Sequence, residues 1–312
     1  TSTSDTNFKI IHPSYEVNEK FLVLGFRRKV LADDKPVDRN FYLVMEDGTP
    51  RIEQEETFKI GEIRAVPELR ERVLMDISER WSWADVEDFA FHPTAPAPGE
   101  CYREILRLLR EHLEFQDDGQ YGLVAAWIIG TYFHRLFHAY PFLSFYGKKQ
   151  SGKSRALDFI ERLAFNAMKM KGVSIPALAD SVDGVRGTFI MDQAEILSDR
   201  RNVELLGILA DSYTTGGGKR RIVSITQKAR KVLEFETYGP KAFASIREMD
   251  TDLRDRCILV VMLRGRREFP YPEAHLPVWG RLREMLYRLL LTRWRVARGM
   301  YAAAGGEMKQ RV

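Results

Sequence analysis

Eight consecutive residues could do chemistry on a phosphate. They match the pattern G-x-x-x-x-G-K-[ST] and read Gly147-Lys148-Lys149-Gln150-Ser151-Gly152-Lys153-Ser154. Glycines let backbone N–H groups curl around a phosphate, and the positive end of a following helix favours the same anion. In this pattern Lys153 would bridge the β- and γ-phosphates, and the Ser154 hydroxyl would hold Mg²⁺. We therefore predict that these residues and the adjoining Arg155 bind ATP.

Such a loop needs a strand before it and a helix after it, and the sequence predicts both. Residues 142–146 are an apolar strand candidate, and 154–165 are a helix candidate. Further strands are predicted at 168–173, 188–192, 241–245 and 257–263, and further helices at 176–182 and 203–212. This alternation is typical of an α/β fold with a parallel sheet.

The predicted strand 188–192 ends in a carboxylate. Asp192 is expected to be a second Mg²⁺ ligand, acting through water. The next residue is Gln193, whose amide cannot accept a proton at neutral pH, so hydrolysis is expected to be impaired. Either Glu195 supplies the base from the following turn, or Gln193 is a substitution that holds ATP unhydrolysed. We favour the second, because a carboxylate two residues farther on is expected to leave the strand end in a different direction.

Polar residues near the last two strands are candidates for contact with the γ-phosphate. The strand 241–245 is expected between the first and third strands, so Ser245, or in second place Arg247, could touch this phosphate. Arg256 is expected after a short helix, with Arg254 as its reserve, where it could reach a neighbouring subunit's nucleotide. A guanidinium suits this task because it stays charged and meets phosphate oxygens with a fixed fork.

Taken together, these motifs resemble the AAA+ core over about 140–263, with a helical lid beyond. In detail they look most similar to MCM-like and superfamily 3 helicases, including those of mobile elements and phages. The resemblance implies ATP and Mg²⁺ as cofactors, a homo-oligomeric, hexameric ring, and DNA and a primase or other replication protein as partners. The sequence departs from the family at Gln193, where the family has an acid, and at 245–247, where an asparagine is usual.

A basic segment lies before the strand 241–245. Residues 219–237 predict a β-hairpin, and its turn region carries Lys228, Arg230 and Lys231 without a compensating acid. Such crowding is repulsive unless a polyanion binds. The placement resembles the pre-sensor hairpin with which the helicases named above hold DNA, although an ordinary solvated hairpin would have the same pattern.

The 312 residues, 45% hydrophobic and 29% charged, suffice for two or more compact units and exclude a disordered chain. We expect a small β-rich N-terminal domain (1–95), a helical connector (96–140), the ATPase core (141–265) and a C-terminal helical lid (266–312). A proline-rich stretch at 92–99 marks the first boundary. Asp47-Gly48 predicts a tight hairpin turn within the first domain.

Several classes of protein are excluded by composition and pattern. Two distant cysteines, Cys101 and Cys257, are too few for a disulfide scaffold. No apolar stretch is long enough to cross a membrane, so no membrane partner and a cytoplasmic location are expected. His134 and His138 stand four apart on one predicted helix face, but core positions are favoured over a metal site. Because the sequence begins at Thr1, we expect a piece of a longer protein.

These observations favour a ring-forming, ATP-dependent DNA helicase or translocase. The alternative from another class is an AAA+ nucleotide switch, such as a loader or a transposition regulator, that binds DNA without unwinding it. A third alternative is a small-molecule P-loop kinase, which would act as a monomer and would not need the basic hairpin.

Overall fold

The computed structural model describes residues 8–68, 80–170, 174–198, 202–226, 229–265 and 267–310. The chain divides into two compact units. The N-terminal unit comprises Thr1–Pro96 and Arg283–Val312, and the sheet unit comprises Ala97–Leu282. The segment 266–312, which is predicted as a single lid, is divided between the two units after Leu282.

Short strands make up the first part of the N-terminal unit. They are β1 (Phe8–Ile11), β2 (Tyr15–Val17), β3 (Phe21–Ala32), β4 (Lys35–Glu46), β5 (Thr49–Glu53), β6 (Phe58–Ile60) and β7 (Ile63–Pro67). In the described ranges they form a four-stranded antiparallel sheet, β2-β3-β4-β5, and a three-stranded sheet, β1-β7-β6. Asp47 and Gly48 join β4 to β5 with φ angles of 48° and 81°, which confirms the predicted turn.

Two helices complete the N-terminal unit. They are α1 (Trp83–Phe91) and the part of α8 (Pro277–Gln310) that follows Leu282. Tyr287 of α8 stacks on Trp81, with ring centroids 5.1 Å apart, and the Arg288 guanidinium donates to the Asp88 carboxylate at 2.7 Å. These contacts explain why the last helix belongs mainly to this unit: its aromatic and basic side chains have their partners there. Within the described residues, no helix combines the length and the low polarity needed to cross a bilayer.

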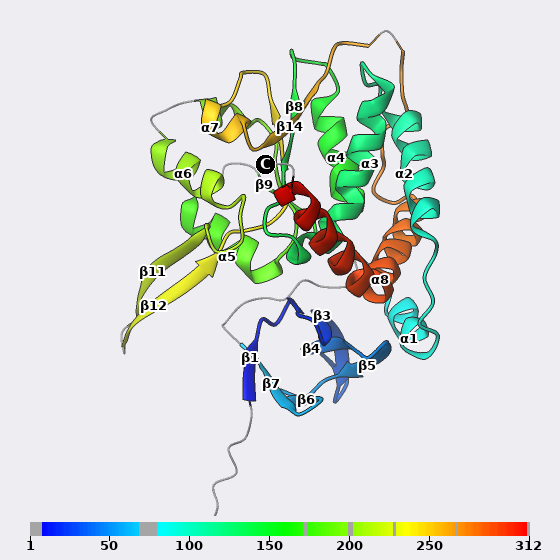
Figure 1. The fold of residues 1–312 in the computed structure, drawn as a ribbon, viewed down its shortest axis with the longest axis vertical. Helices are drawn as coiled ribbons and strands as arrows, with labels where there is room; N and C mark the ends of the chain where they lie inside the picture. Colours follow the sequence, from blue (N-terminus) through cyan, green and yellow to red (C-terminus); the bar gives the residue numbers. More distant parts are fainter. Residues whose placement is uncertain are drawn as a thin grey trace, which may run out of the picture. The chain divides into compact units, whose positions relative to one another are not determined.

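The sheet unit is α/β, with a parallel sheet at its centre (Figure 1). Its strands are β8 (Phe142–Tyr146), β9 (Met168–Met170), β10 (Phe189–Met191), β13 (Lys241–Ser245) and β14 (Cys257–Val261). In the described part of the unit, these five strands are all parallel, in the order β14-β8-β13-β10-β9. β13 therefore lies between β8 and β10, as predicted. Parallel strands end at one edge of the sheet, where ligands of such folds bind.

Helices flank this sheet. They are α2 (Pro98–His112), α3 (Asp118–Phe133), α4 (Lys153–Leu163), α5 (Ile175–Val185), α6 (Val203–Asp211) and the short α7 (Thr251–Arg254). α2 begins within the proline-rich stretch 92–99, because proline is well tolerated in the first turn of a helix.

α3 ends at Phe133, so the prediction that His134 and His138 share one helix face is wrong. His134 is buried with Nδ1 2.8 Å from the Thr131 carbonyl oxygen, and burial holds its pKa well below the usual value.

The predicted hairpin 219–237 forms from β11 (Lys219–Thr226) and β12 (Ala229–Glu236), which pair antiparallel and pack at α5 (Figure 1). Lys228 lies outside the described residues, and of Arg230 and Lys231 only the backbone, in β12, is described. At the base, the Glu236 carboxylate pairs with Arg135 at 2.9 Å and with Arg186 at 3.6 Å. Burial alone would raise the pKa of Glu236, but these two arginines hold it below its usual value. Partly buried ion pairs thus anchor the base of the hairpin.

A buried lysine lies where this hairpin leads into β13. The Lys241 Nζ is fully covered and donates to the carbonyl oxygens of Thr237 at 2.8 Å and Gly239 at 3.1 Å. Burial lowers its pKa from 10.5 to about 7. No acid pairs with it among the described residues, so the charged form is disfavoured in the native state.

Stability of the sheet unit is therefore expected to rise with pH above neutrality. Between pH 7 and 10.5 the unfolded chain holds a proton on Lys241 that the native chain has lost, so the free energy of unfolding should rise by about 1 kcal/mol per pH unit. Urea unfolding at pH 7, 8 and 9 measures this slope. Lys241→Met should reduce the slope by that amount, and equal slopes in the two proteins would show that Lys241 is not titrating there.

Candidate functional site

The loop 147–152 joins β8 to α4 at the carboxyl edge of the sheet. Gly147 is required sterically, because a Cβ there would lie 2.1 Å from the Met262 carbonyl oxygen. Its N–H donates to the Ser245 carbonyl oxygen at 3.3 Å, which ties the start of the loop to β13. Gly152 has a φ of 87° and occupies the N-cap of α4. Because glycine offers no side chain to cap the helix, the first N–H groups of α4 remain available to an anion.

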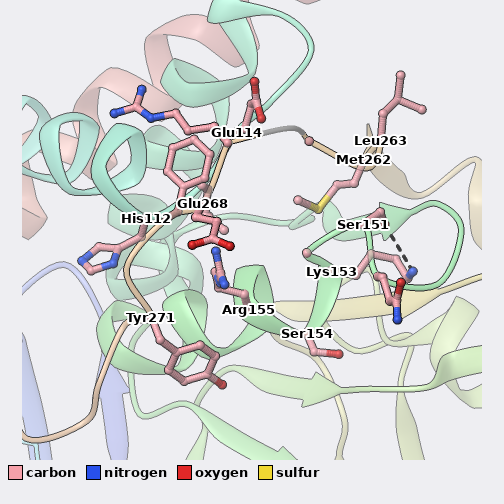
Figure 2. Close-up of a pocket in the computed structure, with 16 residues that line it drawn as sticks. His112, Glu114, Ser151, Lys153, Ser154, Arg155, Met262, Leu263, Glu268 and Tyr271 are labelled. Carbon is pink, nitrogen blue, oxygen red and sulfur yellow. Dashed lines mark hydrogen bonds between the residues drawn. The ribbon is translucent and has the colours of Figure 1, made fainter.

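The Lys153 ammonium is folded back onto this loop. Its Nζ donates to the carbonyl oxygens of Gly147 at 2.8 Å and Lys148 at 2.7 Å, and lies 3.4 Å from Ser151 Oγ (Figure 2). Burial lowers the pKa of Lys153, and the negative charges of Glu195 and Asp192 act in the opposite direction. A phosphate in the loop would offer this ammonium charged oxygens in place of neutral carbonyls, which makes the stronger bond.

Ser154 and Asp192 come together although 38 positions separate them. The Ser154 Oγ donates to Asp192 Oδ1 at 3.2 Å, and Asp192 Oδ2 lies 3.7 Å from Lys169 Nζ. A hydroxyl and a carboxylate are oxygen donors of the kind that Mg²⁺ prefers. No cluster of three or more His, Cys, Asp or Glu side chains occurs among the described residues. Two protein ligands fit Mg²⁺, which usually keeps several waters and binds substrate phosphates as well.

Gln193, whose amide cannot act as a base, and Glu195, whose carboxylate could, differ in their surroundings. Gln193 follows β10 with a φ of 58° and is exposed, and its N–H donates to Asp192 Oδ1 at 2.9 Å. Glu195 lies in the 3₁₀ turn Ala194–Ser198 and is partly buried. Its Oε1 accepts the Ile246 N–H at 3.2 Å, just past the end of β13. The structure thus brings Glu195 back towards the carboxyl edge, which differs from the direction expected from the sequence.

Ser245 and Arg247 form a local turn. The buried Ser245 Oγ donates to the Arg247 carbonyl oxygen at 2.7 Å and accepts the Arg247 N–H at 3.1 Å. The hydroxyl expected to touch the γ-phosphate is therefore engaged with the chain's own backbone, while the Arg247 residue is exposed. The neighbouring position, Ile246, contributes its N–H to Glu195.

Arg256 lies at the opposite edge of the sheet. Its carbonyl oxygen accepts the N–H of Phe142, the first residue of β8, whereas the loop follows the last residue of β8. Five strand residues at about 3.3 Å each place this backbone about 17 Å from the start of the loop. The Arg256 guanidinium donates to the Asp252 carbonyl oxygen, and Arg254 pairs with Glu248 at 3.4 Å. The structure therefore does not bring these arginines to the loop of the same chain.

A cavity of about 600 Å³ lies beside the loop and is lined by residues 150–155, by 112–114 and by side chains between 262 and 271. In Figure 2 the side chains of Arg155 and Glu268 point towards each other, and Tyr271 lies next to them. The Arg155 guanidinium is 5.9 Å from the Tyr271 ring centre, and the Tyr271 hydroxyl donates to Asp158. Sequence reasoning identified the loop side of this cavity but not its other walls, because they come from separate segments that share no motif.

The comparisons with known proteins identify no family. No protein-family model matches the sequence, and no curated protein matches it significantly. Among solved structures, the A form apo structure of the C-terminal region of NrS-1 is 11% identical, with a TM-score of 0.44, over 84% of this chain and 66% of that one. A second A form apo structure, of residues 305–718, is 13% identical, with a TM-score of 0.40, over 78% and 57%. The chain thus spans less than two thirds of either structure's length.

Proposed function

We propose that this chain is an AAA+ P-loop ATPase that acts on DNA as a ring-forming helicase or translocase. The observation that carries the proposal is the 3.2 Å approach of Ser154 Oγ to Asp192 Oδ1 at the carboxyl edge of the sheet. It joins the hydroxyl of the phosphate-loop motif to the carboxylate at the end of β10, with β13 lying between β8 and β10. This is the pairing that an Mg²⁺ nucleotide site requires.

Each residue of the site would have a distinct role. The loop N–H groups would bind the phosphates of ATP, and Lys153 would leave its carbonyl partners for the β- and γ-phosphates. Ser154 and Asp192 would hold Mg²⁺, which neutralises phosphate charge when bound. The cavity beside the loop would receive the rest of the nucleotide, since its volume of about 600 Å³ lies in the range of small-molecule sites.

In a ring, a neighbouring subunit would supply Arg256 to this site. Because the Arg256 backbone lies at the amino edge of the sheet, its guanidinium would serve a neighbouring subunit's nucleotide and not its own. Such an interface is head-to-tail, since the loop of one chain meets the arginine of the next, and interfaces of this kind form a ring when the rotation between subunits closes. Assembly would then be part of catalysis.

The hairpin β11–β12 is the proposed DNA contact. It belongs to the sheet unit, and its base is anchored by the partly buried pairs of Glu236 with Arg135 and Arg186. β13, the strand that follows the hairpin in sequence, ends at Ser245, whose carbonyl oxygen bonds the first loop residue. A conformational change of the loop on nucleotide binding could therefore be transmitted to the hairpin through β13.

Removal of the basic residues at the hairpin's turn is expected to weaken DNA binding selectively. Alanine at Lys228, Arg230 and Lys231 should lower DNA affinity at least tenfold at low salt, and should reduce the slope of log affinity against log salt by about 2 to 3. Fluorescence anisotropy with labelled DNA measures both quantities. Lys219→Ala, which removes a lysine paired with Glu234 at 2.9 Å, is the control and should change little. Unchanged DNA affinity in the triple variant would remove the hairpin's role.

A nucleotide switch without unwinding activity is the second candidate, and Gln193 favours it because no acid directly follows Asp192. A forked duplex separates the two candidates. A motor displaces a strand in proportion to the ATP consumed, whereas a switch binds DNA in response to ATP and leaves the fork intact. Strand displacement with ATP, and none with a non-hydrolysable analogue, supports the motor.

A further inference from the structure

A second carboxylate, that of Glu195, follows β10 shortly after Asp192. Glu195 lies three residues after Asp192, and a turn of 3₁₀ helix brings it back towards the end of β13. The left-handed backbone of Gln193, with a φ of 58°, lets the chain make this turn directly after the strand. Residue 193 is left exposed as a result, while residue 195 is partly buried.

A chain of contacts fixes where this carboxylate lies. Glu195 Oε1 accepts the N–H of Ile246 at 3.2 Å, and the preceding residue, Ser245, accepts the N–H of Gly147 through its carbonyl oxygen at 3.3 Å. The Ser245 carbonyl and the Ile246 N–H belong to one trans peptide and point in opposite directions, so Glu195 lies on the β10 side of the end of β13 and Gly147 on its β8 side. Among the described residues, no further donor binds its carboxylate, so one oxygen stays available to a water.

We propose that Glu195, and not residue 193, is the catalytic base of this site. The inference rests on the proposed function. A water held by the available carboxylate oxygen attacks the γ-phosphorus: the water oxygen bonds to phosphorus, and the bond from phosphorus to the β–γ bridging oxygen breaks. The water proton passes to Glu195, the bridging oxygen leaves with its electron pair on ADP, and inorganic phosphate is released. The chain is then competent for hydrolysis without an acid at position 193.

The test compares Glu195→Gln with Gln193→Ala in the presence of Mg²⁺ and DNA. An amide oxygen can still accept the Ile246 N–H, so Glu195→Gln keeps the tether and removes only the proton acceptor. We expect its kcat for ATP hydrolysis to fall at least 100-fold while the dissociation constant for ATP changes less than about threefold. Gln193→Ala should keep kcat within about threefold. After incubation with ATP, nucleotide recovered from Glu195→Gln should be ATP, and from the unaltered chain ADP.

Different results overturn different claims. If Glu195→Gln hydrolyses ATP at the rate of the unaltered chain, or if Gln193→Glu raises that rate by orders of magnitude, the assignment of Glu195 is wrong and nucleotide binding at the loop is unaffected. If the unaltered chain binds ATP but never cleaves it, the assignment is again wrong. If the unaltered chain does not bind ATP at all, the proposed function itself fails.

Discussion

Replacement of Lys153 by alanine is expected to lower ATP affinity and ATP hydrolysis at least 100-fold. The ammonium is folded onto the loop, where it already contacts two carbonyl oxygens and lies near a hydroxyl. Its removal leaves the γ-phosphate charge without its direct partner in a partly buried site, where such contacts are worth several kcal/mol. Isothermal titration with ATP and Mg²⁺ measures the affinity, and phosphate release measures the rate.

Lys149→Ala is the matched control, because Lys149 lies exposed at a variable position of the same loop. It should change affinity by less than about threefold. Because Lys153 also bonds the loop itself, the melting temperature of both variants should be recorded, so that a folding defect is recognised. Equal ATP affinity in Lys153→Ala and the unaltered chain would place the nucleotide elsewhere.

Arg256→Ala is expected to reduce ATP hydrolysis by about 10³-fold or more, and the loss should be partly reversed by a second inactive variant. The reason is geometric, because the Arg256 backbone lies about 17 Å from its own loop, across the length of β8. In an equal mixture of Arg256→Ala and Lys153→Ala chains, some sites are complete. In these sites an Arg256→Ala chain binds the nucleotide with its own Lys153, and a neighbouring Lys153→Ala chain supplies Arg256. That combination occurs at about a quarter of head-to-tail interfaces, one half times one half.

The mixture should therefore recover a measurable fraction of the hydrolysis of the unaltered chain, although each variant alone has almost none. Arg254→Ala tests the reserve assignment and is expected to have a smaller effect, since Arg254 pairs with Glu248 at the surface. A mixture as inactive as its components would show that Arg256 does not complete a neighbour's site.

Much of the sheet unit could be predicted from the sequence, because its signals are local. β8 and β13 have the predicted bounds, and the hairpin β11–β12 and the turn at Asp47-Gly48 lie where their turn residues and alternating strands indicate. The position of β13 between β8 and β10 was predicted together with the phosphate-loop motif. The motif and the carboxylate that ends the strand 188–192 also predicted Ser154 and Asp192 as two ligands of one metal, and the two side chains are in contact.

The remainder depends on tertiary contacts that no short pattern records. The apolar stripe of α8 could have packed on either unit, and only its partners, such as Trp81 and Asp88, determine that residues after Leu282 join the N-terminal unit. The sequence predicts a turn at Glu195 but not where its carboxylate lies, which depends on the left-handed backbone of Gln193 and on the bond to the Ile246 N–H. The distant walls of the cavity, His112 and Tyr271 among them, come from segments 159 positions apart in the sequence.

ATP hydrolysis by the unaltered chain, followed as phosphate release with and without a forked DNA duplex, is the most direct test of the proposed ring-forming ATPase. We expect Mg²⁺-dependent hydrolysis that DNA accelerates and that rises more steeply than in proportion to protein concentration, because each site needs two chains. Absence of ATP cleavage at every protein concentration, with DNA and Mg²⁺ present, would contradict it.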